Sequence, residues 1–201
     1  MLELGPGSGL QVEGDFQAPA GADNLALRAA AELGREVAIR LVKRIPPGSG
    51  MGGGSSDAAA ILRHFGAGAD LARKLGADVE FFLRGGRQVV RGTGDRLELQ
   101  ADVAAWYAIA WPGFALSTAA VYAKWDQVGG DGRNQLFAAA CAVEPRLREF
   151  AGRLGAGWTM TGSGSAFFYE AASEPEARRA EAGLAALGCW SAVASSLPAF
   201  G

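Results

Sequence analysis

Apolar side chains occupy every second position of residues 37–41, and smaller or polar ones stand between them. A period of two is typical of a β-strand with one buried face. Residues 104–111 are almost all apolar, which predicts a strand in the middle of a sheet. Shorter runs of these two kinds predict further strands at residues 10–13, 88–91, 96–99, 158–161, 166–169 and 190–194.

Helices are predicted where a capping residue precedes apolar positions three or four apart and a glycine follows them. Asp23 is expected to cap a helix over residues 24–33, and Ser173 with Glu176 has the spacing of a capping box for a helix that continues to Leu187. Further helices are predicted at residues 56–65, 69–75, 117–125, 134–143 and 145–154. This order of elements predicts an α+β fold with two lobes, residues 1–100 and 101–201.

Residues 43–60 are the most informative segment, and they read Lys-Arg-Ile-Pro-Pro-Gly-Ser-Gly-Met-Gly-Gly-Gly-Ser-Ser-Asp-Ala-Ala-Ala. Pro46 and Pro47 stiffen the exit from a predicted strand. Ser55 and Ser56 then open a helix whose first N–H groups and positive dipole end favour an anion. The glycines between them, which let the backbone approach a ligand closely, are Gly48, Gly50, Gly52, Gly53 and Gly54. A glycine run is usually a flexible loop, but this density of glycines favours a cradle for phosphate.

The composition is that of an ordinary globular protein, because 49% of its 201 residues are hydrophobic and 20% are charged. A net charge of -2 and the lack of Lys or Arg runs argue against binding of nucleic acid or an anionic membrane. No apolar run reaches the length of a membrane span, and no secretion signal is present, so we expect a cytosolic protein. Cys141 and Cys189 belong to no CxxC pair, which favours free thiols over a disulfide or a metal site.

Three segments resemble the GHMP family of small-molecule kinases, in the family's order. Residues 43–60 resemble its second motif, in the version with three glycines before Ser-Ser-Asp-Ala-Ala. Residues 76–86, Gly-Ala-Asp-Val-Glu-Phe-Phe-Leu-Arg-Gly-Gly, are similar to its Gly-Ala-Asp-Val-Pro-Phe-Phe block, and residues 92–95, Gly-Thr-Gly-Asp, to the Gly-x-Gly-Glu that follows. Residues 160–168, Met-Thr-Gly-Ser-Gly-Ser-Ala-Phe-Phe, resemble the third motif. The matches cover most of residues 23–170.

The resemblance implies a two-lobed GHMP-kinase-like fold and ATP-dependent phosphorylation of a small alcohol, with Mg²⁺ as cofactor. The three-glycine motif resembles that of kinases acting on the 2-hydroxyl of 4-diphosphocytidyl-2-C-methyl-D-erythritol, in non-mevalonate isoprenoid biosynthesis. Asp78 matches the catalytic aspartate, which would accept the hydroxyl proton. A solvated turn aspartate is the alternative. Glu80 replaces the usual proline, and in an extended stretch it would point away from Asp78.

The resemblance also implies residues that hold the two substrates. Asn24 and Lys43 match positions that contact adenine or lie beside it, while helix capping and a solvated strand end are their alternatives. Thr118 and Tyr122 match the acceptor pocket, where the aromatic ring stacks on cytosine, and a buried core tyrosine is the alternative for Tyr122. A second loop would supply N–H groups near the acceptor's phosphates unless it is only a tight turn, and it consists of Gly162, Ser163 and Gly164.

The chain also departs from the family's pattern. Its first residues, Met-Leu-Glu-Leu-Gly, match a point that the family reaches only after an Ala-Lys-x-Asn-Leu strand and a Gly-Tyr-His turn, so we expect an incomplete N-terminal lobe. The expected partner is a small-molecule substrate, bound by a monomer or a homodimer. Two alternative functions stay open, a non-catalytic nucleotide-binding remnant of such a kinase and a GHMP kinase for another small alcohol.

Overall fold

The computed structural model describes residues 1–92, 94 and 96–200, and divides into two compact units. The first unit consists of Met1–Pro47, Gly52–Val103 and Leu197–Gly201, and the second of Gly48–Met51 and Ala104–Ser196. The chain therefore changes unit twice within the glycine loop. Thr93 and Asp95, which belong to the motif at residues 92–95, lie outside the described residues.

The first unit contains a three-stranded sheet in the order β1 (Leu2–Gly5), β3 (Ala38–Lys43), β2 (Gly9–Gly14). β1 runs antiparallel to β3 and β2 runs parallel to it. The strands predicted at residues 10–13 and 37–41 are confirmed to within two residues. β1 was not predicted, since four residues with two leucines are too few for a period to show.

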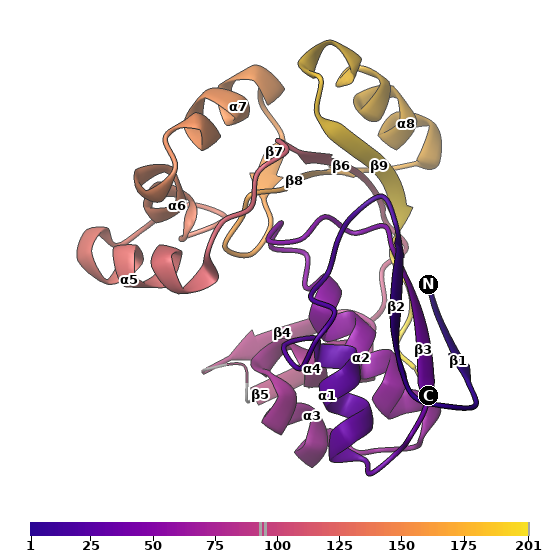
Figure 1. Cartoon of the computed structure of the whole chain (residues 1–201). Helices are drawn as coiled ribbons and strands as arrows, with labels where there is room; N and C mark the ends of the chain where they lie inside the picture. Colours follow the sequence, from indigo (N-terminus) through magenta and orange to yellow (C-terminus); the bar gives the residue numbers. More distant parts are fainter. Residues whose placement is uncertain (93, 95, 201) are drawn as a thin grey trace. The chain divides into compact units, whose positions relative to one another are not determined.

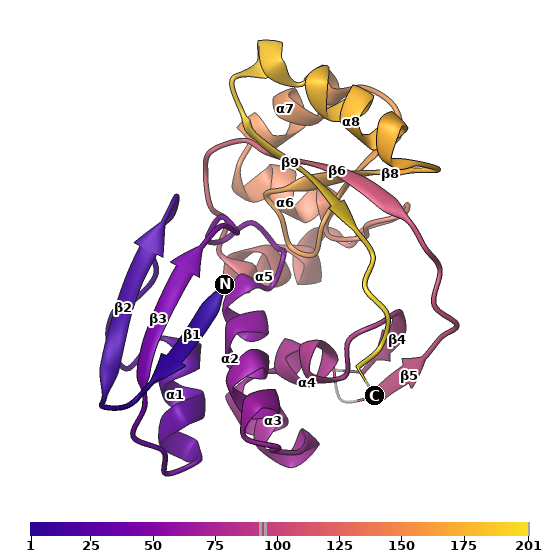
Figure 2. The same cartoon turned by 90° about the vertical axis from the view of Figure 1, so that its right-hand side faces the viewer.

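Helices α1 (Leu25–Glu32) and α2 (Gly53–His64) cover one face of this sheet (Figure 2). Helices α3 (Ala69–Leu75) and α4 (Ala77–Arg84) and a hairpin of β4 (Gln88–Arg91) and β5 (Arg96–Leu99) complete the unit. Ile39 and Leu41 of β3 join the core that Ile61 and Leu62 of α2 form, and all four side chains are at most 2% exposed. The alternating pattern of β3 is thus explained by burial of one face.

Three local predictions in this unit need correction. Asn24, not Asp23, is the N-cap of α1, because its side chain accepts the N–H of Ala26. α2 begins at Gly53, three residues before the predicted start, and its N-cap is Gly52, whose left-handed backbone is available to glycine without strain. Residues 77–84 form α4 and are not extended, and the acidic side chains of its first turn favour a helix N-terminus.

The second unit is built on an antiparallel four-stranded sheet in the order β7 (Trp158–Met160), β8 (Phe167–Ala171), β6 (Trp106–Trp111), β9 (Trp190–Ser195). β6 pairs with β8 on one side and with β9 on the other, which confirms its predicted inner position. The apolar run of residues 104–111 is explained by this place between two strands.

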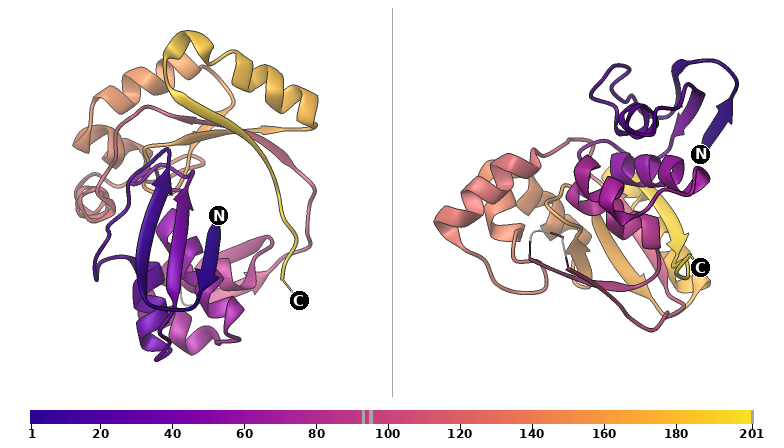
Figure 3. Two further views of the ribbon diagram at one scale, coloured as in Figure 1. Left: turned by 45° about the vertical axis from the view of Figure 1, so that its right-hand side comes forward. Right: turned by 90° about the horizontal axis from the view of Figure 1, so that it is seen from below.

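Four helices accompany this sheet, namely α5 (Thr118–Val128), α6 (Phe137–Val143), α7 (Arg146–Leu154) and α8 (Glu174–Ala182). α7 and α8 lie along the same face of the sheet (Figure 3, left, orange and yellow helices). Figure 1 shows these helices together with the strands of the sheet, and this mixture fits the predicted α+β class. Within the described residues, no helix is long and apolar enough to cross a membrane.

The capping box predicted for α8 is only half formed. The Ser173 hydroxyl accepts the N–H of Glu176, as predicted. The Glu176 carboxylate does not return to Ser173 but accepts the Ala172 N–H at 2.9 Å and the Tyr169 hydroxyl at 3.0 Å. The helix also ends at Ala182, and a 3₁₀ turn at Ala185–Leu187 covers the rest of the predicted length.

Candidate functional site

The second half of the glycine loop forms the start of α2. Gly52 is its N-cap with a φ of 66°, and no side chain caps the helix. The N–H of Ser56 donates to the Gly52 carbonyl at 2.9 Å, so the N–H groups of Gly53, Gly54 and Ser55 precede the first intrahelical hydrogen bond. These groups and the positive end of the helix dipole suit an anion such as phosphate.

Lys43 lies beside this helix start. The residue is 6% exposed, and its Nζ donates to Oδ2 of Asp57 at 2.7 Å. A Cβ on Gly53 would lie 3.3 Å from this nitrogen. Burial raises the pKa of Asp57, and the hydrogen bond and charge of Lys43 oppose that rise. The alternative of a solvated strand end is therefore wrong, and a buried cation adjoins the free N–H groups.

Asn24 is held by the helix that it caps. Its Oδ1 accepts the Ala26 N–H at 2.9 Å, and its Nδ2 donates to the Pro19 carbonyl at 2.8 Å. Asn24 is 5% exposed. Helix capping thus explains the position and the hydrogen bonds of Asn24. The contact with adenine that the resemblance implies stays a prediction.

Asp78 lies in the first turn of α4, where its side chain is exposed. Phe82 stands one turn later, and its ring would be 2.4 Å from a Cβ on Gly52. Residues four apart on a helix share one face. Asp78 therefore lies on the face of α4 that packs against Gly52, the N-cap of α2. The helix start that follows Gly52 is the predicted phosphate cradle.

Glu80 is buried and tied to two arginines. Its Oε2 accepts from Arg73 at 2.8 Å and its Oε1 from Arg84 at 2.5 Å, while the carboxylate is 2% exposed. Side chains two apart on a helix diverge, so Glu80 does point away from Asp78, as expected, but on a helix and not in an extended stretch. The residue that replaces the family's proline thus has a structural role at the junction of α3 and α4.

The first half of the glycine loop packs inside the second unit. The Gly48 carbonyl accepts the Leu116 N–H at 3.0 Å. A Cβ on Gly50 would lie 2.3 Å from the Thr161 carbonyl oxygen, and the Thr161 hydroxyl donates to the Gly50 carbonyl at 3.0 Å. Glycine is needed at position 50 for this close approach as well as for its φ of 76°. Thr161 was not among the predicted site residues, although it belongs to the third motif.

The proposed acceptor residues also come together in the second unit. The hydroxyls of Thr118 and Ser163 are 2.9 Å apart. Tyr122 follows Thr118 by one turn of α5 and is 51% exposed, so the alternative of a buried core tyrosine is wrong. Gly162 and Gly164 flank Ser163 with φ values of 51° and 87°. A hydroxyl pair, an exposed ring on the same helix face and a glycine loop thus belong to one unit.

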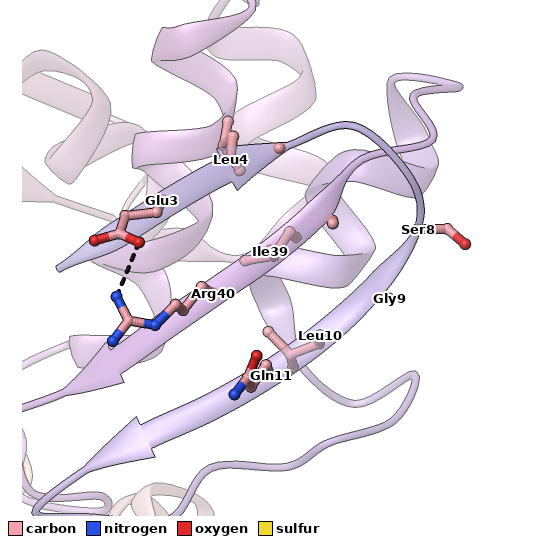
Figure 4. A pocket seen from close by; sticks show the side chains of 10 residues that line it. Glu3, Leu4, Ser8, Gly9, Leu10, Gln11, Ile39 and Arg40 are labelled. Atoms are coloured by element: carbon pink, nitrogen blue, oxygen red, sulfur yellow. Dashed lines mark hydrogen bonds and ion pairs between the residues drawn. The ribbon is translucent and has the colours of Figure 1, made fainter.

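Two hollows in the structure contain none of the predicted site residues. One of about 530 Å³ lies over the β1–β3–β2 sheet, where Arg40 binds Glu3 at 2.9 Å (Figure 4). The other, of about 480 Å³, lies in the second unit and is bordered by Asn134, Trp158 and Met160. In the described part of the chain, no three His, Cys, Asp or Glu side chains gather as a metal site.

Comparisons with known proteins agree with this arrangement. The model of the GHMP kinases N terminal domain matches residues 24–86. The 4-diphosphocytidyl-2-C-methyl-D-erythritol kinase of Thermus thermophilus is 39% identical, over 86% of this chain and 76% of that protein. The kinase of the same name from Paracoccus denitrificans is 36% identical, over 88% of this chain and 75% of that protein.

Solved structures give the same result. A crystal structure of 4-(cytidine 5'-diphospho)-2C-methyl-D-erythritol kinase matches with a TM-score of 0.76 and 36% identity, covering 98% of this chain and 85% of that one. A homoserine kinase from Cytophaga hutchinsonii matches with a TM-score of 0.58 and 21% identity, which shows the shared fold alone. The predicted α+β class with a GHMP-kinase fold is therefore confirmed. The chain belongs to the 4-diphosphocytidyl-2-C-methyl-D-erythritol kinase family of the GHMP kinases.

Proposed function

We propose that this chain transfers the γ-phosphoryl group of ATP to the 2-hydroxyl of 4-diphosphocytidyl-2-C-methyl-D-erythritol. The observation that carries this proposal is the identity of 36% or more with kinases of that name over most of the chain. In the reaction the hydroxyl oxygen forms a bond to the γ-phosphorus, the bond from that phosphorus to the β,γ-bridging oxygen breaks, and ADP leaves. The hydroxyl proton passes to a base.

The phosphates of ATP would bind at the start of α2. Three N–H groups before the first intrahelical bond supply hydrogen bonds, and the buried ammonium of Lys43 adds positive charge. The proposed contacts to the nucleotide come from Asn24, Lys43, Pro46 and the segment 48–56. Mg²⁺, when bound with ATP, would neutralise phosphate charge.

Asp78 is the proposed base. Its carboxylate is exposed on the face of α4 that packs against Gly52, so it can meet a hydroxyl brought to the γ-phosphate. Thr118 and Tyr122 would hold the cytidine, with the exposed ring of Tyr122 stacked on the base. The N–H groups of Gly162 and Ser163 would contact the acceptor's phosphates, whereas the Gly164 N–H closes a turn by donating to the Thr161 carbonyl at 2.9 Å.

A coupled assay of ADP release with the purified chain, ATP, Mg²⁺ and the methylerythritol acceptor tests the proposal. Asp78→Asn should lower kcat by about 10²–10⁴-fold and leave the Kd of ATP unchanged. Glu149→Gln, at an exposed carboxylate on α7 and outside the proposed site, is the control and should keep wild-type kcat. Turnover of homoserine or mevalonate derivatives in place of the acceptor would reject the substrate, and ATP binding without any turnover would indicate a nucleotide-binding protein.

The proposal includes a cytosolic location and a monomeric or homodimeric state. A net charge of -2 without basic runs offers no attraction for nucleic acid or an anionic membrane.

A further inference from the structure

Asn134 lies in the connection between α5 and α6, outside every motif of the sequence. Its Nδ2 donates to the Met160 carbonyl at 2.6 Å and to the Gly162 carbonyl at 2.9 Å. Its Oδ1 accepts the N–H of Leu136 at 2.9 Å. One amide proton is therefore used on Gly162 of the second glycine loop and the other on Met160 at the end of β7, and the oxygen is fixed by the Leu136 N–H.

The bond to Gly162 sets the direction of the next N–H group. In a trans peptide the C=O of one residue and the N–H of the next point in opposite directions. Because the Gly162 carbonyl is turned toward Asn134, the N–H of Ser163 is turned away from it. Ser163 is 6% exposed, and among the described residues of its unit no acceptor is found for this N–H.

An N–H group without an acceptor in a buried residue is rare in a native protein and is expected to meet a ligand or water. The side chain of the same residue contacts the Thr118 hydroxyl at 2.9 Å. The free N–H of Ser163 therefore belongs to the group of residues proposed to hold the acceptor.

We infer that Asn134 is a positioning residue, which orients the peptide between Gly162 and Ser163 so that the Ser163 N–H donates to a phosphate oxygen of the acceptor. This inference rests on the proposed function, because it assigns the ligand of the loop from that reaction. Asn134 touches no substrate and acts through the loop alone.

The test is the variant Asn134→Asp, which keeps the oxygen for the Leu136 N–H but replaces the donor with a carboxylate that repels both loop carbonyls. The acceptor's KM should rise by about tenfold, as expected for one lost hydrogen bond, while the Kd of ATP changes less than about twofold. Gln135→Ala, at the exposed neighbouring residue, should leave both constants unchanged. A loss of stability alone would affect both substrates together, and that result would overturn the inference, as would unchanged constants.

A second measurement needs no variant. In ¹⁵N-labelled wild-type protein, titration with the acceptor should shift the Ser163 amide resonance downfield, and a resonance that does not move would overturn the inference. Failure of the proposed function is distinguishable, because wild-type protein would then show no turnover of this acceptor and the inference would fall with it. Normal wild-type turnover with an unaffected Asn134→Asp would reject the inference only.

Discussion

Substitution of the buried Glu80 by Gln should destabilise the first unit by about 2–3 kcal/mol. Each carboxylate oxygen of Glu80 accepts one hydrogen bond from an arginine, at 2.8 Å from Arg73 and at 2.5 Å from Arg84. Hydrogen bonds to charged groups contribute about 1.5–3 kcal/mol each. Glutamine keeps one acceptor oxygen but brings an NH₂ group against the other guanidinium, so one bond is lost and the other loses its charge. The arginines are 43% and 47% exposed, and their access to water limits the loss.

The matched control is Glu174→Gln, because Glu174 and Arg178 form the same i,i+4 pair at 2.5 Å on α8, where the carboxylate is 38% exposed. Exposed pairs of this kind contribute about 0.3–0.5 kcal/mol. Urea unfolding should be followed by circular dichroism, since all five tryptophans lie in the second unit and fluorescence does not report the first directly. The reasoning is refuted if the two variants lose equal free energy of unfolding.

Two further changes test the glycine loop. Gly50→Ala places a Cβ 2.3 Å from the Thr161 carbonyl oxygen. It should lower the free energy of unfolding by at least about 2 kcal/mol more than Gly188→Ala, where φ is also positive but no atom lies within 4 Å of the added Cβ. Equal midpoints of urea unfolding, followed by tryptophan fluorescence, would contradict this. Burial raises the pKa of Asp57, so its neutral form stabilises the fold below the ordinary pKa and this contribution is lost as the pH rises through the raised one. The free energy of unfolding of Asp57→Asn, relative to wild type, should therefore increase between about pH 3 and pH 7, and a flat or falling difference in urea titrations would show that Lys43 outweighs burial.

Most elements of the fold were predictable because their signals are local. Burial of one face gives β3 its period of two, and two neighbouring strands give β6 its apolar run. The extended stretch expected at residues 77–84 is instead helix α4, and the reason lies in tertiary contacts. Glu80 favours the helix through ion pairs with Arg73, seven residues away on α3, and with Arg84, and no local period indicates the first of these.

The motifs of the candidate site were predictable from the sequence, but the structural roles of their single residues were not. The sequence presents five glycines in one loop as equivalent. In the structure Gly52 caps α2, whereas Gly50 is required by the Thr161 carbonyl, 111 residues along the chain. Two alternatives were open from the sequence for each of three side chains, and only their packing in the structure decides between them. Asn24 caps α1, Lys43 is buried and Tyr122 is exposed.

The sequence by itself determined the α+β order, the glycine-rich start of α2 and the family, because the hydrophobic period, the φ preference of glycine and each motif are properties of residues close together in the chain. Only the tertiary structure decided which N–H and C=O groups of the site form hydrogen bonds within the protein and which have no partner there. Asn134 reaches carbonyls 26 and 28 residues away, and the direction of the Ser163 N–H depends on that contact. Hydrogen bonds between distant residues form only when packing brings their atoms within about 3 Å, and no local pattern records them.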